Sequence, residues 1–204
     1  MTFEPSKNLS AVGALLIVIG AALGSVVSFS GILSITGLIL LLIGLKGLAT
    51  FYKEEGIFNN ALYSILIAIG GCVVGVGVIV VSAVSALADL GIDWANIEDW
   101  GNVGTDVGTV FADFDFSAIA TLLGALLVGI IILFVTMIIS MYFIRKSMNQ
   151  LSTKSGIGLF GTAGLLMLIG AVIPVIGLLI IWIGYILATV AFFQMKKENS
   201  HTPS

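Results

Sequence analysis

The sequence predicts an all-α protein, a polytopic bundle of transmembrane helices with six segments arranged as three hairpin-like pairs. Of the 204 residues, 59% are hydrophobic and 9% are charged, whereas a soluble domain carries about a quarter charged residues. A soluble fold of this size has too little interior to bury so much apolar surface. A bilayer solvates such surface, and helices within it satisfy their own backbone hydrogen bonds.

The charged residues are gathered at a few places and leave four long uncharged windows. These windows lie between Lys7 and Lys46, Glu55 and Asp89, Asp115 and Arg145, and Lys154 and Lys196. About 20 apolar residues, at roughly 1.5 Å each, cross a hydrocarbon core of about 30 Å. The two middle windows therefore fit one long helix each, and the first and last windows are about twice too long for one helix.

The two longest windows are expected to fold back on themselves. The first has a serine-rich turn at 25–31, and the last has Pro174 and Gly177 near its centre. Proline lacks the donor that a helix interior needs, and glycine tolerates turn conformations. We therefore expect a single membrane domain, 1–204, with segments at about 10–27, 31–52, 59–88, 117–143, 157–173 and 176–195. Re-entrant outer hairpins are the alternative architecture, and a signal peptide is the rival interpretation of the first segment.

Basic residues set the predicted orientation. With six crossings, one side of the membrane carries Lys7, Lys53, Arg145, Lys146, Lys154, Lys196 and Lys197, and the other side carries no Lys or Arg. Because basic residues favour the cytoplasm, we expect a multi-pass protein of the cell membrane with both termini cytoplasmic. The acidic loop 89–116 then lies outside, where Trp94 and Trp100 are predicted to anchor it at the membrane interface.

A weak internal repeat relates the first pair of segments to the last. Residues 14–21 resemble residues 164–171, and the spacing of Gly37 and Gly44 recurs in Gly177 and Gly184. Both copies start and end on the same side, so the repeat is parallel. Many alternating-access transporters use inverted repeats instead, which counts against that mechanism here.

Small residues occur at interface spacing in several segments. Gly20 and Gly24 form one GxxxG pattern, Gly71 and Gly75 form another, and Gly124 lies among small residues of the fourth segment. Such residues let helix backbones approach closely. We expect them to pack helices within one chain, with a homo-oligomer interface as the alternative.

A polar connection, 53–60, joins the second and third segments. The local interpretation is that Gly56 ends one helix and Asn59 or Asn60 caps the next. The functional interpretation is a cytoplasmic contact site for a partner, formed by Lys53, Glu54, Glu55, Asn59 and Asn60. Lys46, about two turns inside the second segment, is expected to extend its ammonium group to the inner interface.

The sequence offers little for catalysis or for metal binding. The single histidine, His201, lies in the C-terminal tail, and the expected spans hold no carboxylate. General acid–base chemistry usually needs such groups in a sheltered site, and the residues 113–115 fall short of a calcium-binding loop. We therefore predict no enzyme activity, no catalytic residue, no cofactor and no metal, and we expect no nucleic-acid partner because no basic face remains.

Several stretches of the chain resemble a known family. They run from Val12 to Gly20, from Leu45 through the more specific stretch 51–61, and from Gly161 to Gly170. Together they resemble the domain of unknown function 996 family, which comprises uncharacterised, largely archaeal integral membrane proteins. The resemblance covers most of the chain outside the acidic loop. It implies an archaeal-like membrane protein and carries no mechanism with it.

Two functions remain as hypotheses. The first is a non-enzymatic packing or accessory component that contacts the lipid bilayer and packs with itself or with a partner membrane protein. Its support is the number of packing glycines and the lack of a charged pathway through the expected spans. The second is a channel or carrier for a small uncharged solute, lined by backbone groups and Ser, Thr, Asn or Tyr side chains.

Cysteine accessibility tests the predicted topology. In a Cys72→Ser background, single cysteines replace Ser28, Phe58, Asp99, Lys154 and Ile176 in turn. We expect an impermeant thiol reagent, applied to right-side-out vesicles, to label positions 28, 99 and 176 and to spare 58 and 154. Labelling at 99 alone would contradict full crossing by the outer hairpins and would favour re-entrant ones.

Overall fold

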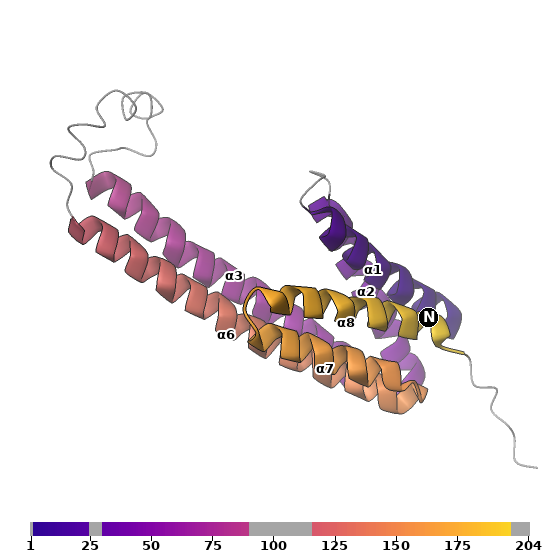
Figure 1. The fold of residues 1–204 in the computed structure, drawn as a ribbon. Coiled ribbons are helices and arrows are strands. Elements are labelled where there is room, and N and C mark those ends of the chain that lie inside the picture. Colours follow the sequence, from indigo (N-terminus) through magenta and orange to yellow (C-terminus); the bar gives the residue numbers. More distant parts are fainter. Residues whose placement is uncertain (1, 25–29, 90–115, 197–204) are drawn as a thin grey trace, which may run out of the picture. The chain divides into compact units, whose positions relative to one another are not determined.

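The computed structural model describes residues 2–24, 30–89 and 116–196, and over these residues the secondary structure is helical (Figure 1). The described helices are α1 (Phe3–Leu23), α2 (Ser30–Tyr52), α3 (Glu55–Asp89), α6 (Phe116–Ser155), α7 (Gly158–Val172) and α8 (Ile176–Gln194). All of them except α7 are long and apolar enough to cross a membrane. The prediction of an all-α protein with six helical segments is confirmed for this part of the chain. Trp94 and Trp100 lie outside the described residues, as does the whole stretch 90–115 of the predicted acidic loop.

Several helices extend beyond the uncharged windows of the sequence. Helix α1 begins at Phe3 rather than near residue 10, α3 begins at Glu55 rather than near 59, and α6 continues to Ser155 rather than to about 143. Charges do not end these helices, because Glu, Lys and Arg are good helix formers. An acidic residue in the first turn, as in α1 and α3, also interacts favourably with the helix dipole.

The chain forms two compact units. The first, here called the six-helix unit, comprises residues 1–67 and 137–204, and the second, the two-helix unit, comprises residues 68–136. Helices α1, α2, α7 and α8 belong wholly to the six-helix unit, together with the beginning of α3 and the end of α6. The two-helix unit contains the remaining described parts of α3 and α6. A single membrane domain over the whole chain stays a prediction.

The hydrophobic core of the six-helix unit is drawn from all of its helices. Its fully buried large side chains include Leu45, Leu48, Ile57, Leu151, Phe160 and Phe192. The rings of Phe160 and Phe192 meet edge to face with their centroids 4.8 Å apart, a favoured geometry for aromatic pairs. Each of these residues lies near the helix end that also carries the charged residues, so the core sits at that end of the unit.

Glycines bring α1 and α2 into backbone contact. A Cβ atom at Gly13 would lie 2.6 Å from the carbonyl oxygen of Gly37 and 2.9 Å from Leu41 Cα. A Cβ atom at Gly44 would lie 2.8 Å from the carbonyl oxygen of Ser6. These distances are shorter than a real Cβ atom tolerates, and they involve backbone atoms that cannot swing aside. The close approach of the two helices therefore depends on the absence of side chains at these positions.

The α7–α8 hairpin repeats these contacts. Gly184 of α8 faces Ala163 of α7, as Gly37 of α2 faces Gly13 of α1. Residues of α7 therefore follow their α1 counterparts by 150 positions, and residues of α8 follow their α2 counterparts by 147. The same offsets hold for a second close contact. Gly170 of α7 faces Gly177 and Ile181 of α8, just as Gly20 of α1 faces Ser30 and Ser34 of α2.

This register corrects one detail of the repeat. The sequence comparison matched Gly37 with Gly177, whereas the contacts make Gly37 the counterpart of Gly184. The error is seven residues, or about two helical turns. It arose because glycines spaced by seven occur in both helices, so the spacing alone allows either alignment.

Helices α3 and α6 pair within the two-helix unit by the same device. A Cβ atom at Gly75 would lie 2.7 Å from Leu133 Cγ, and one at Gly129 would lie 2.5 Å from Ile79 Cγ1. The apolar windows of these two helices are only 11% and 6% buried, compared with 33–39% for α1, α2 and α8. Most of the apolar surface of α3 and α6 is therefore left for lipid or for another protein.

Helix α7 is short for a membrane crossing. Its 15 residues, at roughly 1.5 Å each, span about 22 Å, and the hydrocarbon core is about 30 Å thick. The turn that follows is tight, because Val175 has φ 65° and ψ −70° and the Ile176 N–H donates to the carbonyl of Pro174 at 2.8 Å. This conformation is strained for a β-branched residue. Full crossing by the last hairpin stays a prediction.

A single methyl group at Gly13 tests the α1–α2 contact. We expect Gly13→Ala to destabilise the protein by about 1–3 kcal/mol, because overpacking a tight contact displaces backbone. Gly31→Ala is the matched control in the same hairpin, where a Cβ atom meets nothing within 4 Å among the described residues. The measurement is unfolding in detergent followed by far-UV circular dichroism. Equal stability of the two variants would contradict the contact.

Candidate functional site

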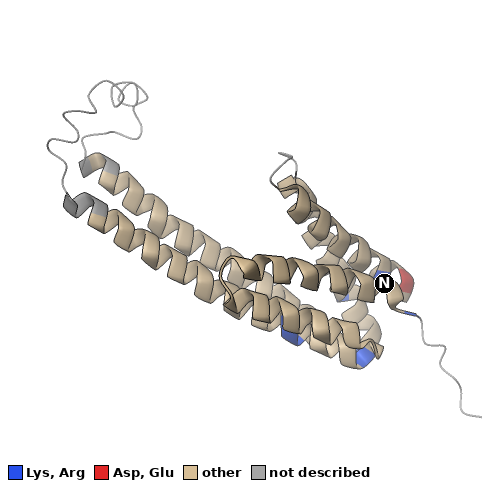
Figure 2. Ribbon diagram, viewed as in Figure 1, with Lys and Arg blue, Asp and Glu red and all other residues tan. Residues whose placement is uncertain are grey.

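In the described part of the six-helix unit, the charged residues lie toward one end of the helices (Figure 2). Lys7 pairs with Glu4 at 2.9 Å, and Lys154 pairs with Glu54 at 3.3 Å. The ammonium group of Lys7 also donates to the carbonyl of Met195 at 3.3 Å, which joins the start of α1 to the end of α8. Exposed ion pairs contribute only about 0–1 kcal/mol. These ion pairs therefore indicate a polar, solvated end of the unit, and they contribute little to its stability.

The turn between α2 and α3 forms without the predicted caps. Lys53 adopts the left-handed conformation with φ 52°, and the N–H of Glu54 donates to the carbonyl of Ala49 at 2.9 Å. This pattern closes a helix in the way that glycine usually does. Because α3 begins at once at Glu55, Gly56 and the two asparagines lie inside it. The prediction that Gly56 ends a helix and an asparagine caps the next was wrong.

Asn60 has an internal role that the sequence did not indicate. Its amide nitrogen donates to the Gly56 carbonyl at 2.6 Å and to Gln150 Oε1 of α6 at 3.0 Å. Ser147 of α6 donates to the Ile57 carbonyl at 2.6 Å in the same interface. Satisfied buried polar groups of this kind fix one arrangement of two helices. They set the register of α3 on α6 at the charged end.

A further pair of hydroxyls continues this interface deeper into the unit. The hydroxyls of Ser64 and Ser140 are 2.8 Å apart, and the Ser140 hydroxyl also lies 3.1 Å from the Ser64 carbonyl. Both side chains are buried. The only sequence signal was the spacing of the polar residues, with Asn60 and Ser64 one turn apart on α3 and Ser140 and Ser147 two turns apart on α6.

Three of the five residues predicted to contact a partner line one pocket of about 550 Å³. Lys53, Glu55 and Asn59 share it with Lys46, Ala49, Thr50 and Phe58. The ammonium group of Lys46 lies 5.8 Å from the centroid of the Phe58 ring, within range of a cation–π interaction. The other two predicted residues, Glu54 and Asn60, are engaged with α6 instead.

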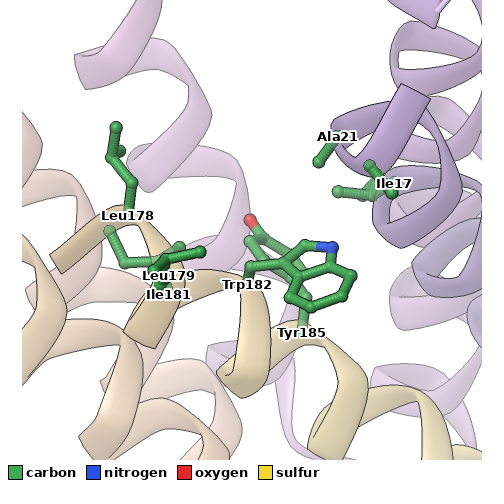
Figure 3. Close-up of a pocket in the computed structure, with 8 residues that line it drawn as sticks. Ile17, Ala21, Leu178, Leu179, Ile181, Trp182 and Tyr185 are labelled. Atoms are coloured by element: carbon green, nitrogen blue, oxygen red, sulfur yellow. The ribbon is translucent and has the colours of Figure 1, made fainter. Parts of the chain in front are cut away.

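A second pocket, of about 620 Å³, lies between α1 and α8 (Figure 3). It is lined by Ile17, Ala21 and Ala22 of α1 and by Leu178, Leu179, Ile181, Trp182 and Tyr185 of α8. The indole N–H of Trp182 donates to the carbonyl of Val18 at 3.0 Å, which holds the ring against α1. Contact between α1 and α8 could not be predicted from the sequence, because the two helices lie at opposite ends of the chain. The available signal was Trp182 and Tyr185, two amphipathic aromatic residues among the aliphatic residues of the first half of α8.

Comparison with known proteins identifies the family. The family described as protein of unknown function (DUF996) matches residues 33–192. The chain belongs to this family. The uncharacterized protein MJ1644 of the archaeon Methanocaldococcus jannaschii is 27% identical over 205 residues, which cover 98% of both chains. No solved structure matches the chain.

The predicted packing glycines of this DUF996 protein have different surroundings. Gly20, Gly71 and Gly75 each face a neighbouring helix of the chain, at Ser34, Thr136 and Leu133 respectively. A Cβ atom at Gly24 would meet only carbonyls of its own helix, and one at Gly124 would meet nothing within 4 Å among the described residues. The same open space surrounds Gly70 and Gly77 of α3.

The described part of the DUF996 chain has one free thiol and no cluster of metal-binding side chains. Within it, no group of three His, Cys, Asp or Glu side chains is placed to hold a metal ion. Cys72 is an exposed free thiol on α3. His201 lies outside the described residues.

Proposed function

We propose that this protein is a non-enzymatic component of the cell membrane that packs with copies of itself or with a partner membrane protein. The observation that carries this proposal is a pair of glycines on α3, Gly70 and Gly77, that contact no other helix among the described residues. Gly71 and Gly75 face α6, whereas a Cβ atom at Gly70 or Gly77 would meet nothing within 4 Å in the described parts of the chain. A partner helix is the natural occupant of that space.

The energetics of glycine in a lipid-facing helix support this proposal. A glycine in a helix interior costs about 1 kcal/mol relative to alanine, and an exposed glycine recovers none of that cost through contacts within the chain. In a bilayer, apolar surface alone does not drive helix association, because lipid tails are as apolar as leucine. Small residues do promote it, because they let two backbones approach closely.

The positions of Gly70 and Gly77 define a single face. Seven residues make about two turns of α-helix, so the two glycines lie above one another on α3. The neighbouring large side chains on this stretch, Val73, Val74 and Val81, are 69%, 55% and 66% exposed. The face therefore combines two notches with flanking ridges of valine, a shape that suits another helix.

The absence of carboxylate, histidine and basic side chains from long stretches of α3 and α6 supports a non-enzymatic role. The sequence has no Asp, Glu, His, Lys or Arg from Ala68 to Ala88 or from Phe116 to Ile144. A proton relay or a charged-substrate path in these segments would need such residues. Packing with another helix needs none of them.

Self-association measured in liposomes tests the proposal. We expect the labelled wild-type protein to show energy transfer between copies that rises with protein-to-lipid ratio. Gly70→Leu combined with Gly77→Leu should weaken this association at least about tenfold, because two leucines fill the notches. Both substitutions point into open space within the chain, so the helical content should not change.

Val73→Leu is the matched control, since it adds one methylene to an exposed residue of the same stretch without touching a glycine. It should associate like the wild type. Energy transfer that is unaffected by the double glycine substitution would refute this face as a packing surface.

A further inference from the structure

The hydroxyl group of Tyr185 lies near the middle of α8. This helix has 19 residues, of which Tyr185 is the tenth. At roughly 1.5 Å per residue the helix measures about 28 Å, close to the hydrocarbon thickness of about 30 Å. When α8 crosses the membrane, this hydroxyl is therefore placed near the bilayer midplane, far from water at either surface.

Within the described part of the chain, this hydroxyl has no hydrogen-bond partner. Figure 3 shows the Tyr185 side chain beside Trp182, with its oxygen directed into the pocket between α1 and α8. A hydroxyl group without a partner is costly in hydrocarbon, because no solvent there can hydrogen-bond to it. A partner for it has to come from whatever occupies the pocket.

The rest of the pocket wall is suited to an apolar occupant. Among the described residues that line it, Trp182 is the only one besides Tyr185 whose side chain has a polar atom, and its N–H is already used by the Val18 carbonyl. The volume of about 620 Å³ lies within the range of small-molecule sites, about 300–1,000 Å³. The wall therefore offers apolar contact, one flat indole ring and one free hydroxyl donor.

Lipid tails satisfy only part of this description. An acyl or isoprenoid chain fits apolar walls, but it carries no polar atom at this depth, because lipid headgroups and linkages lie at the interfaces. An apolar alcohol would bring a donor of its own that the wall does not satisfy. A carbonyl group brings only an acceptor, which is what the hydroxyl of Tyr185 lacks.

We propose that the pocket between α1 and α8 binds an apolar carbonyl compound of the quinone or aryl ketone class. Its carbonyl oxygen accepts a hydrogen bond from Tyr185, its ring lies against Trp182, and its hydrocarbon part contacts the aliphatic wall. The inference is independent of helix packing through α3, since every residue that lines this pocket belongs to the six-helix unit.

Fluorescence of Trp182 reports directly on this pocket. Replacing Trp94 and Trp100 with phenylalanine leaves Trp182 as the single tryptophan of the full chain. The protein in lipid nanodiscs is titrated with a decyl-substituted benzoquinone, a carbonyl probe that quenches tryptophan. We expect saturable quenching with one dissociation constant.

Substitution of the hydroxyl is the decisive variant. Tyr185→Phe keeps the ring and removes only the donor, and it should raise the dissociation constant about tenfold, as expected for one lost hydrogen bond. Tyr63→Phe is the matched control, because it removes an exposed tyrosine hydroxyl on α3, away from the pocket. It should leave the dissociation constant unchanged.

A space-filling variant separates the site from partition into the bilayer. Ala21→Phe places a ring in the pocket and should abolish the saturable phase, while circular dichroism verifies that the variant stays helical. Quenching that rises linearly with probe in the wild type would mean an adventitious additive only, and it would overturn the proposal. So would saturable quenching with the same dissociation constant in Tyr185→Phe.

Discussion

Hydrocarbon offers no hydrogen bonds to a polypeptide, and the structure of this protein follows from that constraint. A chain with 59% hydrophobic residues must satisfy its backbone within each segment, so the described part of the chain consists almost entirely of helices. Once the helices exist, lipid gives them little reason to associate through apolar area alone. Close approach of backbones then becomes the main source of attraction, and glycine permits it at Gly13, Gly37 and Gly44.

Polar residues add specificity to this packing. Asn60 and Gln150, and Ser64 and Ser140, form hydrogen bonds across α3 and α6 that only one register satisfies. In hydrocarbon the alternative to such a bond is an unsatisfied group, so a slipped register is penalised. The same logic makes Tyr185 informative, because its hydroxyl faces a pocket instead of a partner in the described chain. Helix packing and the proposed ligand binding are in this respect two ways of giving a polar group in hydrocarbon a hydrogen-bond partner.

Much of the fold could be predicted from the sequence, because helices surrounded by lipid must be apolar and uncharged over most of their length. Uncharged windows located six helical segments and indicated that the outer ones come in pairs. Helix ends were harder to predict, because the uncharged windows stop at charged residues, whereas α6 continues through Arg145 to Ser155. The α2–α3 turn was misread because Lys53 takes a left-handed conformation that normally belongs to glycine.

The candidate sites depended on contacts between distant parts of the chain and were harder to predict. Nothing in the local sequence brings Ile17 next to Trp182, so the position of the pocket between α1 and α8 could not be predicted. The polar connection was predicted to contact a partner, and only the geometry separates Asn59, which lines a pocket, from Asn60, which is hydrogen-bonded to α6. Small residues were visible in the sequence, yet which of them face a neighbouring helix was not.

The central claim is that small residues set how close the helices come and in which register. Cross-linking of Ser152→Cys with Gly161→Cys, in a Cys72→Ser background, tests it most directly, because a Cβ atom at Gly161 would lie 3.8 Å from Ser152 Cβ and the close contact at Gly164 stays intact. Disulfides form when Cβ atoms are about 3.5–4.5 Å apart, so mild oxidation in native membranes should join this pair rapidly. Ser152→Cys with Thr162→Cys, one position along α7, should react far more slowly. Equal reaction of the two pairs, or none in either, would contradict the account.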